Sequence, residues 1–123
     1  NVTFTEDSIT WIAVADLSRI SRTAPLGLVV GEQLLIAVRE DDAVIVYQGN
    51  CPHQAARLDR ARITDGWLHC PHHRARFALA TGVCGGGWDL PPLRRFVSRV
   101  ADGHLWLTDP LQPTEDTQAE PPG

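Results

Sequence analysis

Two short segments with matching side chains constrain this chain more than any other feature. Cys51-Pro52-His53 is followed, after sixteen intervening residues, by Cys70-Pro71-His72-His73. Each segment supplies a thiolate and an imidazole, whereas a zinc finger keeps its cysteines together and its histidines together. The order Cys, His, Cys, His suits two metal ions, one held by both thiolates and the other by both imidazoles. We therefore expect the two segments to be loops that share one dinuclear centre.

The second segment continues into an aromatic strand and a Thr-Gly turn, from Phe77 to Gly82. This pattern, C-x-H followed by C-x-x-H and the Thr-Gly turn, resembles the Rieske iron–sulfur family over most of the chain up to about Thr108. Members of that family hold a [2Fe–2S] cluster in which two histidines replace two cysteines on one iron. The resemblance implies one [2Fe–2S] cluster, with these metal ligands and cofactor-binding residues: Cys51, His53, Cys70 and His73.

Several loop positions depart from the family pattern. Glycine usually stands at the places that Ala55 and Arg74 occupy here. High-potential members also have a disulfide between the loops and two hydroxyl donors to the cluster, and the matching positions here are Ala56, His72, Ala75 and Phe77. Hydrogen bonds to the sulfurs help to set the potential. The resemblance therefore implies a potential toward the lower end of the Rieske range of about −150 to +300 mV, as in ferredoxins that supply bacterial oxygenases.

The ligand set also determines what such a centre can do. Two ferric ions, two sulfides, two thiolates and two neutral imidazoles sum to zero charge, whereas four thiolates would leave a net negative charge. An electron is therefore added more easily than to a cluster held by thiolates alone. Each iron already has two sulfides and two protein ligands, which leaves no position for a substrate. We expect a site that transfers electrons and has no catalytic residues.

Composition limits the partners and the compartment. The chain has 123 residues, one domain by size, and a net charge of −4, and all eleven basic residues are arginine. A nucleic-acid partner needs a basic face and is not expected. No apolar run approaches the roughly 20 residues of a membrane span, so no membrane partner is expected either. Two of the three cysteines are assigned to the metal, and the remaining Cys84 favours a reducing, cytoplasmic location.

Short apolar or alternating runs between turn signals predict many short strands. Asp65-Gly66 and Asp102-Gly103 are favoured two-residue hairpin turns, and Asp16–Ile20 is the one weak helical candidate. The pattern predicts an all-β antiparallel sandwich or barrel, which the resemblance identifies with the Rieske (ISP-like) fold. The expected strands are Thr10–Val14, Leu26–Val30, Gln33–Val38, Ala43–Gln48, Ala61–Thr64, Trp67–Cys70, Phe77–Ala80, Arg94–Val100 and His104–Thr108. The expected core or rim aromatics are Trp11, Tyr47, Trp88, Phe96 and Trp106.

Both ligand segments lie within one stretch, about residues 47–87, which we expect to be a small cluster-binding subdomain of a Rieske domain formed by residues 1–108. A hairpin over Ala61–Cys70 is expected to connect the two loops and to bring His53 near His73. Residues 109–123 are acidic and rich in proline, lack apolar periodicity, and are predicted to form a flexible tail.

Other polar residues near the loops have both a functional and a plain interpretation. His72, His69 and His104 are interpreted as loop or surface residues, because only His73 fits C-x-x-H and His69 should point to the face opposite Cys70. Cys84 is interpreted as a small buried residue. The arginines around the loops form either a docking rim for an electron-transfer partner or an ordinary solvated face: Arg57, Arg60, Arg62, Arg74 and Arg76.

Three functions remain open. The resemblance implies a carrier ferredoxin, not itself an enzyme, which passes single electrons from a flavin-containing ferredoxin reductase to the terminal Rieske non-haem iron oxygenase of an aromatic-ring dioxygenase system. The second is a small Rieske subunit of another reductase or oxygenase. The remaining histidines do not form the two-His-one-carboxylate iron site that oxygen activation requires. The third is a structural zinc-binding module with the same four ligands, which would be colourless.

Overall fold

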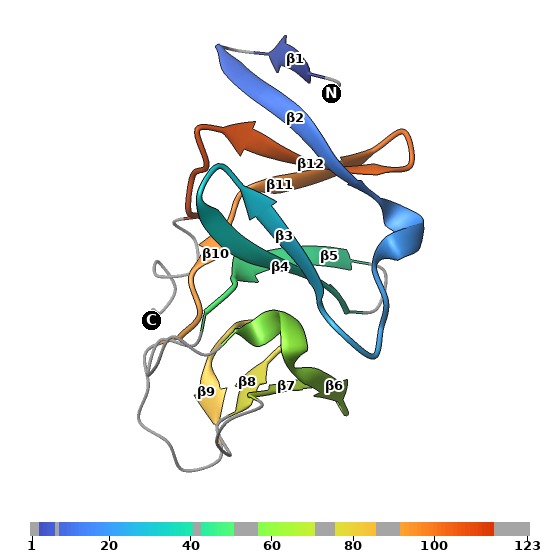
Figure 1. The fold of residues 1–123 in the computed structure, drawn as a ribbon, viewed down its shortest axis with the longest axis vertical. Helices are drawn as coiled ribbons and strands as arrows, with labels where there is room; N and C mark the ends of the chain where they lie inside the picture. The colour runs from blue at the N-terminus through green and yellow to red at the C-terminus, as the bar shows by residue number, and fades with distance from the viewer. Residues whose placement is uncertain are drawn as a thin grey trace.

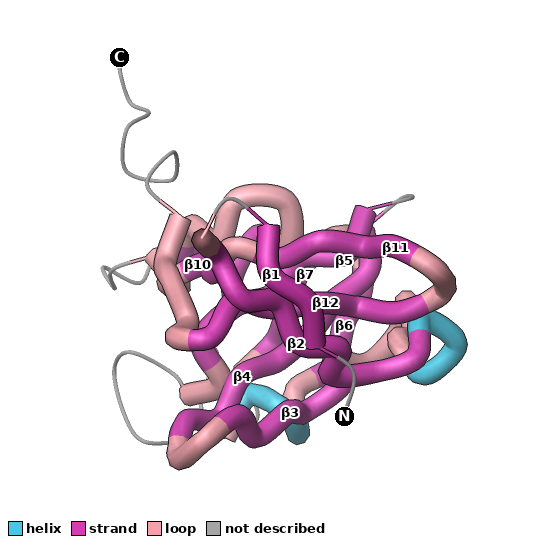
Figure 2. Tube along the Cα trace, turned by 90° about the horizontal axis from the view of Figure 1, so that it is seen from above, coloured by secondary structure: helices cyan, strands magenta, loops and turns pink. Residues whose placement is uncertain are grey.

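The computed structural model describes residues 3–6, 8–40, 43–50, 57–70, 76–85 and 92–114. The strands in these ranges form three four-stranded antiparallel sheets. Figure 1 shows them one below another, with a first sheet at the top, a second in the middle and a small sheet at the bottom. Seen from above, strands of the first sheet lie over those of the other two (Figure 2). The predicted all-β antiparallel fold with a small additional sheet is confirmed.

The first sheet has the order β1-β2-β12-β11, with bounds Thr3–Glu6, Ile9–Asp16, His104–Asp109 and Ser98–Ala101. The second sheet has the order β10-β5-β4-β3, with bounds Arg95–Phe96, Ala43–Gln48, Gln33–Glu40 and Leu26–Val30. The small sheet has the order β6-β7-β8-β9, with bounds Arg62–Thr64, Trp67–His69, Arg76–Ala78 and Cys84–Gly85. Two three-residue 3-10 helices complete the described elements, η1 (Leu17–Arg19) and η2 (Leu58–Arg60). None of the helices in the described ranges has the length and apolar character of a membrane span.

Two hairpin turns follow directly from their sequences. Asp65 and Gly66 have φ of 54° and 79°, and Asp102 and Gly103 have φ of 55° and 76°. Positive φ at both central residues is the turn that matches the twist of paired strands, and Asp-Gly adopts it at little cost. These turns join β6 to β7 and β11 to β12. The predicted hairpin between the ligand segments is therefore confirmed.

Some elements differ from the expectation. The single strand expected over Arg94–Val100 is interrupted at Val97 and becomes β10 and β11, which belong to different sheets. Two described strands, β1 and β9, were not predicted, because runs of four and two residues give too short a pattern to recognise. The weak helical candidate is the 3-10 turn η1.

The segment after β12 is held more firmly than its composition suggests. The Val97 amide donates to the Gln112 carbonyl at 2.8 Å, and the Thr114 amide donates to the Arg95 carbonyl at 2.8 Å. Pro113, which lacks an N–H, sits opposite Phe96 where no donor is needed from it. These bonds tie residues 112–114 to the β10 region. Residues 115–123 lie outside the described ranges, and the tail over residues 109–123 stays a prediction.

Strand β4 is buried on both faces and separates two apolar cores. Leu35 and Ala37 point into the core shared with the first sheet, and Ile36 and Val38 point into the core shared with the small sheet. All four are fully buried. Because side chains alternate along a strand, this continuous apolar run gives each neighbouring sheet a surface on which to pack. Four of the expected core aromatics are buried, namely Trp11, Tyr47, Phe96 and Trp106, whereas Trp88 lies outside the described residues.

Tyr47 on β5 connects the second sheet to the small sheet. Its side chain is 1% exposed, and its hydroxyl donates to the Leu79 carbonyl at 2.7 Å, just beyond β8. Burial raises the pKa of Tyr47 from 10.0 to about 12. A Cβ on Gly82 would approach the Tyr47 ring to 2.9 Å, so the Thr81-Gly82 turn packs directly against it. The ring and its hydroxyl thus fix the position of the turn that follows the second ligand segment.

The shifted pKa of Tyr47 predicts a fall in stability at alkaline pH. Below pH 10 the hydroxyl is protonated in both the folded and the unfolded protein, so its stabilisation is fully present; as pH rises from 10.0 toward about 12, the unfolded state loses its proton first and the free energy of unfolding falls. Tyr47→Phe should remove this dependence and cost about 1 kcal/mol at neutral pH. Tyr47 is the one tyrosine in the chain, so tyrosinate absorbance reports this residue alone. The chain has no lysine, so no lysine titrates in the same pH range. Tyrosinate formation near pH 10 in the folded protein would contradict the account.

Candidate metal centre

Cys70 is the one expected ligand that falls in the described part of the chain. Cys51, His53 and His73 lie outside it, so their assignment stays a prediction. Cys70 follows β7, is 6% exposed, and belongs to the same buried cluster as Leu58 and Leu68. Leu58 lies just after the first ligand segment, and Cys70 begins the second. Both segments therefore leave from one apolar core.

Antiparallel backbone pairs close the chain at the base of each ligand segment. Asn50 pairs with Arg57, and His69 pairs with Arg76. Six residues lie between the members of each pair, 51–56 in what we call the first ligand loop and 70–75 in the second. Each loop therefore starts with its Cys-Pro-His sequence directly after a closing pair. The two loops have the same length and are each closed by an antiparallel pair, which fits the prediction that each segment supplies one cysteine and one histidine.

The first ligand loop is anchored on strand β4. The Leu58 amide donates to the Gly49 carbonyl at 2.7 Å, and the Gly49 amide donates to the Leu34 carbonyl at 2.9 Å. A Cβ on Gly49 would lie 2.6 Å from that same carbonyl oxygen, so only glycine allows the two backbones to approach this closely. The fully buried Leu58 then fixes the far end of the loop in the core.

A second contact holds the end of the first loop against the edge strand β3. The Arg57 guanidinium makes two hydrogen bonds to the Asp59 carboxylate, Nε to Oδ1 at 3.1 Å and NH2 to Oδ2 at 2.8 Å. These bonds hold the pKa of Asp59 below its usual value. Asp59 is 18% exposed, and a Cβ on Gly27 would lie 2.8 Å from its Cβ and Oδ2. Gly27 therefore makes room for the carboxylate that fixes Arg57.

The second ligand loop has an equivalent contact built from different residues. The guanidinium carbon of Arg76 lies 4.6 Å from the centroid of the Trp67 ring, a cation–π arrangement. A Cβ on Gly85 would lie 2.8 Å from two atoms of that ring. Each loop thus ends in an arginine whose partner packs on a glycine of a neighbouring strand.

Sequence reasoning missed these two closing arginines as a pair, although a signal for them exists. Both segments read C-P-H-x-x-A-R, so Arg57 and Arg76 stand at the same offset from Cys51 and Cys70. The repeat extends three residues beyond His73, the last predicted ligand, and so includes residues that the ligand pattern does not contain.

The structure divides the arginines that were expected to form a docking rim. Arg57 is paired with Asp59 and Arg76 lies over Trp67, whereas Arg60 and Arg62 are exposed. Together with His69 and Cys70 these two line a cavity of about 340 Å³. The register places His69 beside Arg62 and Arg76 on one face of the small sheet. His69 lines the same cavity as Cys70, although the sequence predicted that it would point to the opposite face. Arg74 lies outside the described residues.

The described part of the site fits an iron–sulfur centre. Cys70 is shielded from solvent and shares a cavity with the guanidinium groups of Arg60 and Arg62. In the described ranges no three His, Cys, Asp or Glu side chains gather into a metal site, in keeping with Cys70 being the one expected ligand there. His104 pairs with Asp16 at 2.9 Å in the first sheet, and Cys84 is partly buried against the core that contains Cys70.

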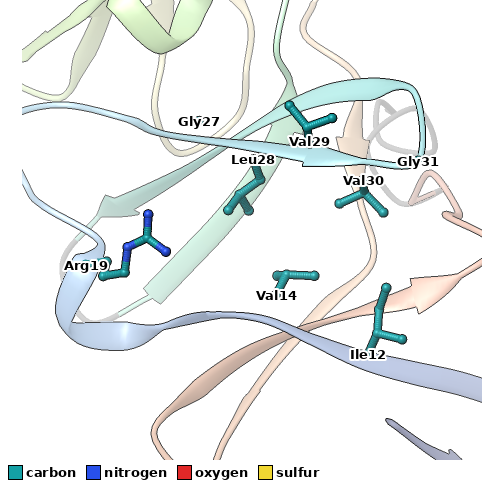
Figure 3. Close-up of a pocket in the computed structure, with 8 residues that line it drawn as sticks. All are labelled: Ile12, Val14, Arg19, Gly27, Leu28, Val29, Val30 and Gly31. Atoms are coloured by element: carbon teal, nitrogen blue, oxygen red, sulfur yellow. The ribbon is translucent and has the colours of Figure 1, made fainter. Parts of the chain in front are cut away.

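A separate groove of about 410 Å³ lies between β2 and β3 (Figure 3). Its described lining is apolar except for Arg19 at one end, and includes Ile12, Val14, Leu28 and Val30. These side chains belong to the first and second sheets and not to the small sheet. The groove offers no metal ligand among these residues and is distinct from the candidate centre.

Comparison with known proteins identifies the family of the chain. The sequence profile of the Rieske [2Fe-2S] domain matches residues 10–97. The ferredoxin component of an alkene monooxygenase system from Xanthobacter autotrophicus is 32% identical over 88 residues, which cover 67% of this chain and 68% of that protein. The anthranilate 1,2-dioxygenase ferredoxin subunit of Burkholderia cepacia is 24% identical over 95 residues, 77% of this chain and 88% of the relative.

A solved structure shows the same fold. The ferredoxin of carbazole 1,9a-dioxygenase from Nocardioides aromaticivorans superposes with a TM-score of 0.71 at 24% identity, covering 85% of this chain and 98% of that one. The fold and the profile match therefore define an iron–sulfur protein of the Rieske class. The profile match over more than half of its length makes the chain a member of the Rieske [2Fe-2S] domain family, and its cofactor is one [2Fe–2S] cluster.

The contact between Gly27 and Asp59 predicts that a single added methyl group will disturb the first ligand loop. Gly27→Ala should cost about 1–3 kcal/mol of unfolding free energy through overpacking and should release iron faster, measured by denaturant unfolding and by decay of the cluster's visible absorption. Asp59→Gly in the same chain should reduce this cost, because it removes the atoms that the new Cβ meets.

Val29→Ala is the matched control on the same strand. Val29 is 70% exposed, so its truncation should change the unfolding free energy by less than about 0.5 kcal/mol. If Gly27→Ala behaves like this control, the contact does not hold the loop.

Proposed function

We propose that the protein is a one-electron carrier ferredoxin of an aromatic-ring dioxygenase system. It takes electrons from a flavin-containing ferredoxin reductase and delivers them to the terminal Rieske non-haem iron oxygenase. The observation that carries this proposal is its similarity to a dioxygenase ferredoxin subunit over 88% of that subunit's length. The 32% identity to the ferredoxin component of a monooxygenase system supports the same role.

In this proposal Cys51, His53, Cys70 and His73 hold the cluster. When bound, the cluster supplies a centre that gains and loses one electron. The residues of the chain keep that centre rigid and dry. The closing pairs at Arg57 and Arg76 fix the bases of the two loops. The apolar core that contains Leu58, Leu68 and Phe77 excludes water from the inner side of these bases. A rigid site reorganises little when its charge changes, which favours fast electron transfer in both directions.

The chain has no catalytic role in this proposal, and its compartment is the cytoplasm. A reducing compartment fits three cysteines of which two are ligands, because structural disulfides are rare there.

We place the end of the Rieske domain at residue 114 instead of 108, because Gln112 and Thr114 are hydrogen-bonded to the β10 region.

The runner-up function is a small Rieske subunit of another reductase or oxygenase. The same four residues would hold the cluster, and the difference lies in whether the protein carries electrons while free in solution. The zinc module has no support, since the family binds an iron–sulfur cluster.

Adjacent histidines in the second loop provide the test. Wild type and His72→Ala should show the electron resonance spectrum of a Rieske cluster when reduced, and should carry electrons from an added ferredoxin reductase to an added Rieske oxygenase. His73→Ala should lose both the spectrum and the transfer, because metal binding needs the full ligand set. A native spectrum in His73→Ala with a lost one in His72→Ala would refute the ligand assignment. An intact cluster that transfers no electron to any dissociable oxygenase would favour the subunit role.

A further inference from the structure

The cavity beside Cys70 has the chemistry of an anion site. Its described lining is Arg60 from η2, Arg62 from β6, His69 from β7 and Cys70. No carboxylate is among these lining residues. Within the described chain the nearest acidic side chain in sequence, Asp59, makes its two hydrogen bonds to Arg57. In that part of the chain neither Arg60 nor Arg62 has an ion-pair partner. Arg57 chiefly, and Arg60 to a smaller extent, lower the pKa of Asp59. Among the described residues, no hydrogen bond or ion pair engages the guanidinium of Arg62.

The charge of the whole chain directs an anion to this end. Residues 47–87 contain five arginines and two aspartates, whereas the rest of the chain contains six arginines and thirteen acidic residues. The segment that holds the cluster is therefore positive in a protein whose net charge is −4. Such a separation of charge orients a negatively charged partner before contact and raises its rate of association.

The size and position of the cavity favour a side-chain carboxylate on a protein surface. About 340 Å³ is enough for a carboxylate and its waters, and a guanidinium fork matches a carboxylate with two parallel hydrogen bonds. Cys70 lines the same cavity, so a group bound there brings the partner's surface next to a residue that holds the cluster. An electron carrier needs this proximity.

We propose that the cavity formed by Arg60, Arg62 and His69 receives a carboxylate of the redox partner, whose docking face is therefore acidic. This inference rests on the proposed carrier function. It narrows the docking contacts to Arg60 and Arg62, and it excludes Arg57 and Arg76, whose guanidinium groups are already engaged by Asp59 and Trp67.

The test uses probes that need only the loaded protein. The reduced protein is oxidised in a stopped-flow instrument by hexacyanoferrate(III), an anion, and by hexaammineruthenium(III), a cation. Arg60→Gln/Arg62→Gln should slow the reaction with the anion roughly tenfold at low ionic strength and flatten its salt dependence, and should not slow the reaction with the cation. A hexaglutamate peptide, which mimics an acidic docking face, should inhibit wild type and not the double variant.

Two further variants distinguish binding at the cavity from an effect of the protein's net charge on the rate. Arg19→Gln removes an exposed arginine that lines the groove between β2 and β3 and should leave both rates within about twofold of wild type, because Arg19 does not line the cavity beside Cys70. Arg60→Lys/Arg62→Lys keeps the charge and should keep most of the rate with the anion, while weakening inhibition by hexaglutamate because the fork is lost. Equal visible absorption in all variants verifies that the cluster is intact.

The proposal is overturned if Arg19→Gln slows the anion as much as the double variant does, or if hexaglutamate inhibits the double variant like wild type. These outcomes do not depend on any oxygenase. Failure to pass electrons to oxygenases, with the anion preference and the peptide effect intact, would count against the carrier function and leave the acidic-partner site standing.

Discussion

Strand β4 is buried on both faces and provides the apolar surfaces on which the first sheet and the small sheet pack. Leu35 and Ala37 pack toward the first sheet while Ile36 and Val38 pack toward the small sheet, and all are fully buried. The small sheet is too short to have a core of its own, since its strands have two or three residues. It is stable only as a layer on this central strand and its neighbour β5, which also carries Tyr47.

The same central layer positions the loops. Strand β5 ends at Gln48, whose side-chain amide donates to the Asn50 carbonyl and whose side-chain oxygen accepts from the Arg94 amide, both at 2.7 Å. The first ligand loop therefore begins from a backbone tied to the segment that leads into β10. Leu58 returns the chain to the core, and the β6–β7 hairpin carries it to Cys70. Apolar packing thus determines where the two loops start, and the ligands need only short excursions from there.

Features set by residues adjacent in the sequence were predictable, and contacts between segments distant in the sequence were not. Asp65-Gly66 and Asp102-Gly103 specify their turns locally, so the hairpins were predictable. Strands such as Leu26–Val30 were predicted to the residue because their apolar runs end in glycine or charged residues. Pairing between distant segments was not predictable. The bond from Thr114 to Arg95 and the contact of Asp59 with Gly27 depend on three-dimensional proximity, which polar and proline-rich stretches do not encode as periodicity. The ligand set stays a prediction from the specific spacing of its residues, and the cavity at Arg60 and Arg62 is recognised only in the folded structure.

The reduction potential distinguishes an oxygenase-type Rieske carrier from the high-potential members of the family. Ala75 and Phe77 offer no hydroxyl to the cluster sulfurs, and Phe77 is fully buried in apolar surroundings. Voltammetry of the loaded protein between about pH 6 and pH 8, where an unperturbed imidazole titrates, should give a potential in the lower part of the range of about −150 to +300 mV that does not change with pH. A strongly positive potential that falls steadily across this window would contradict the account and would place the protein with the high-potential members of its family.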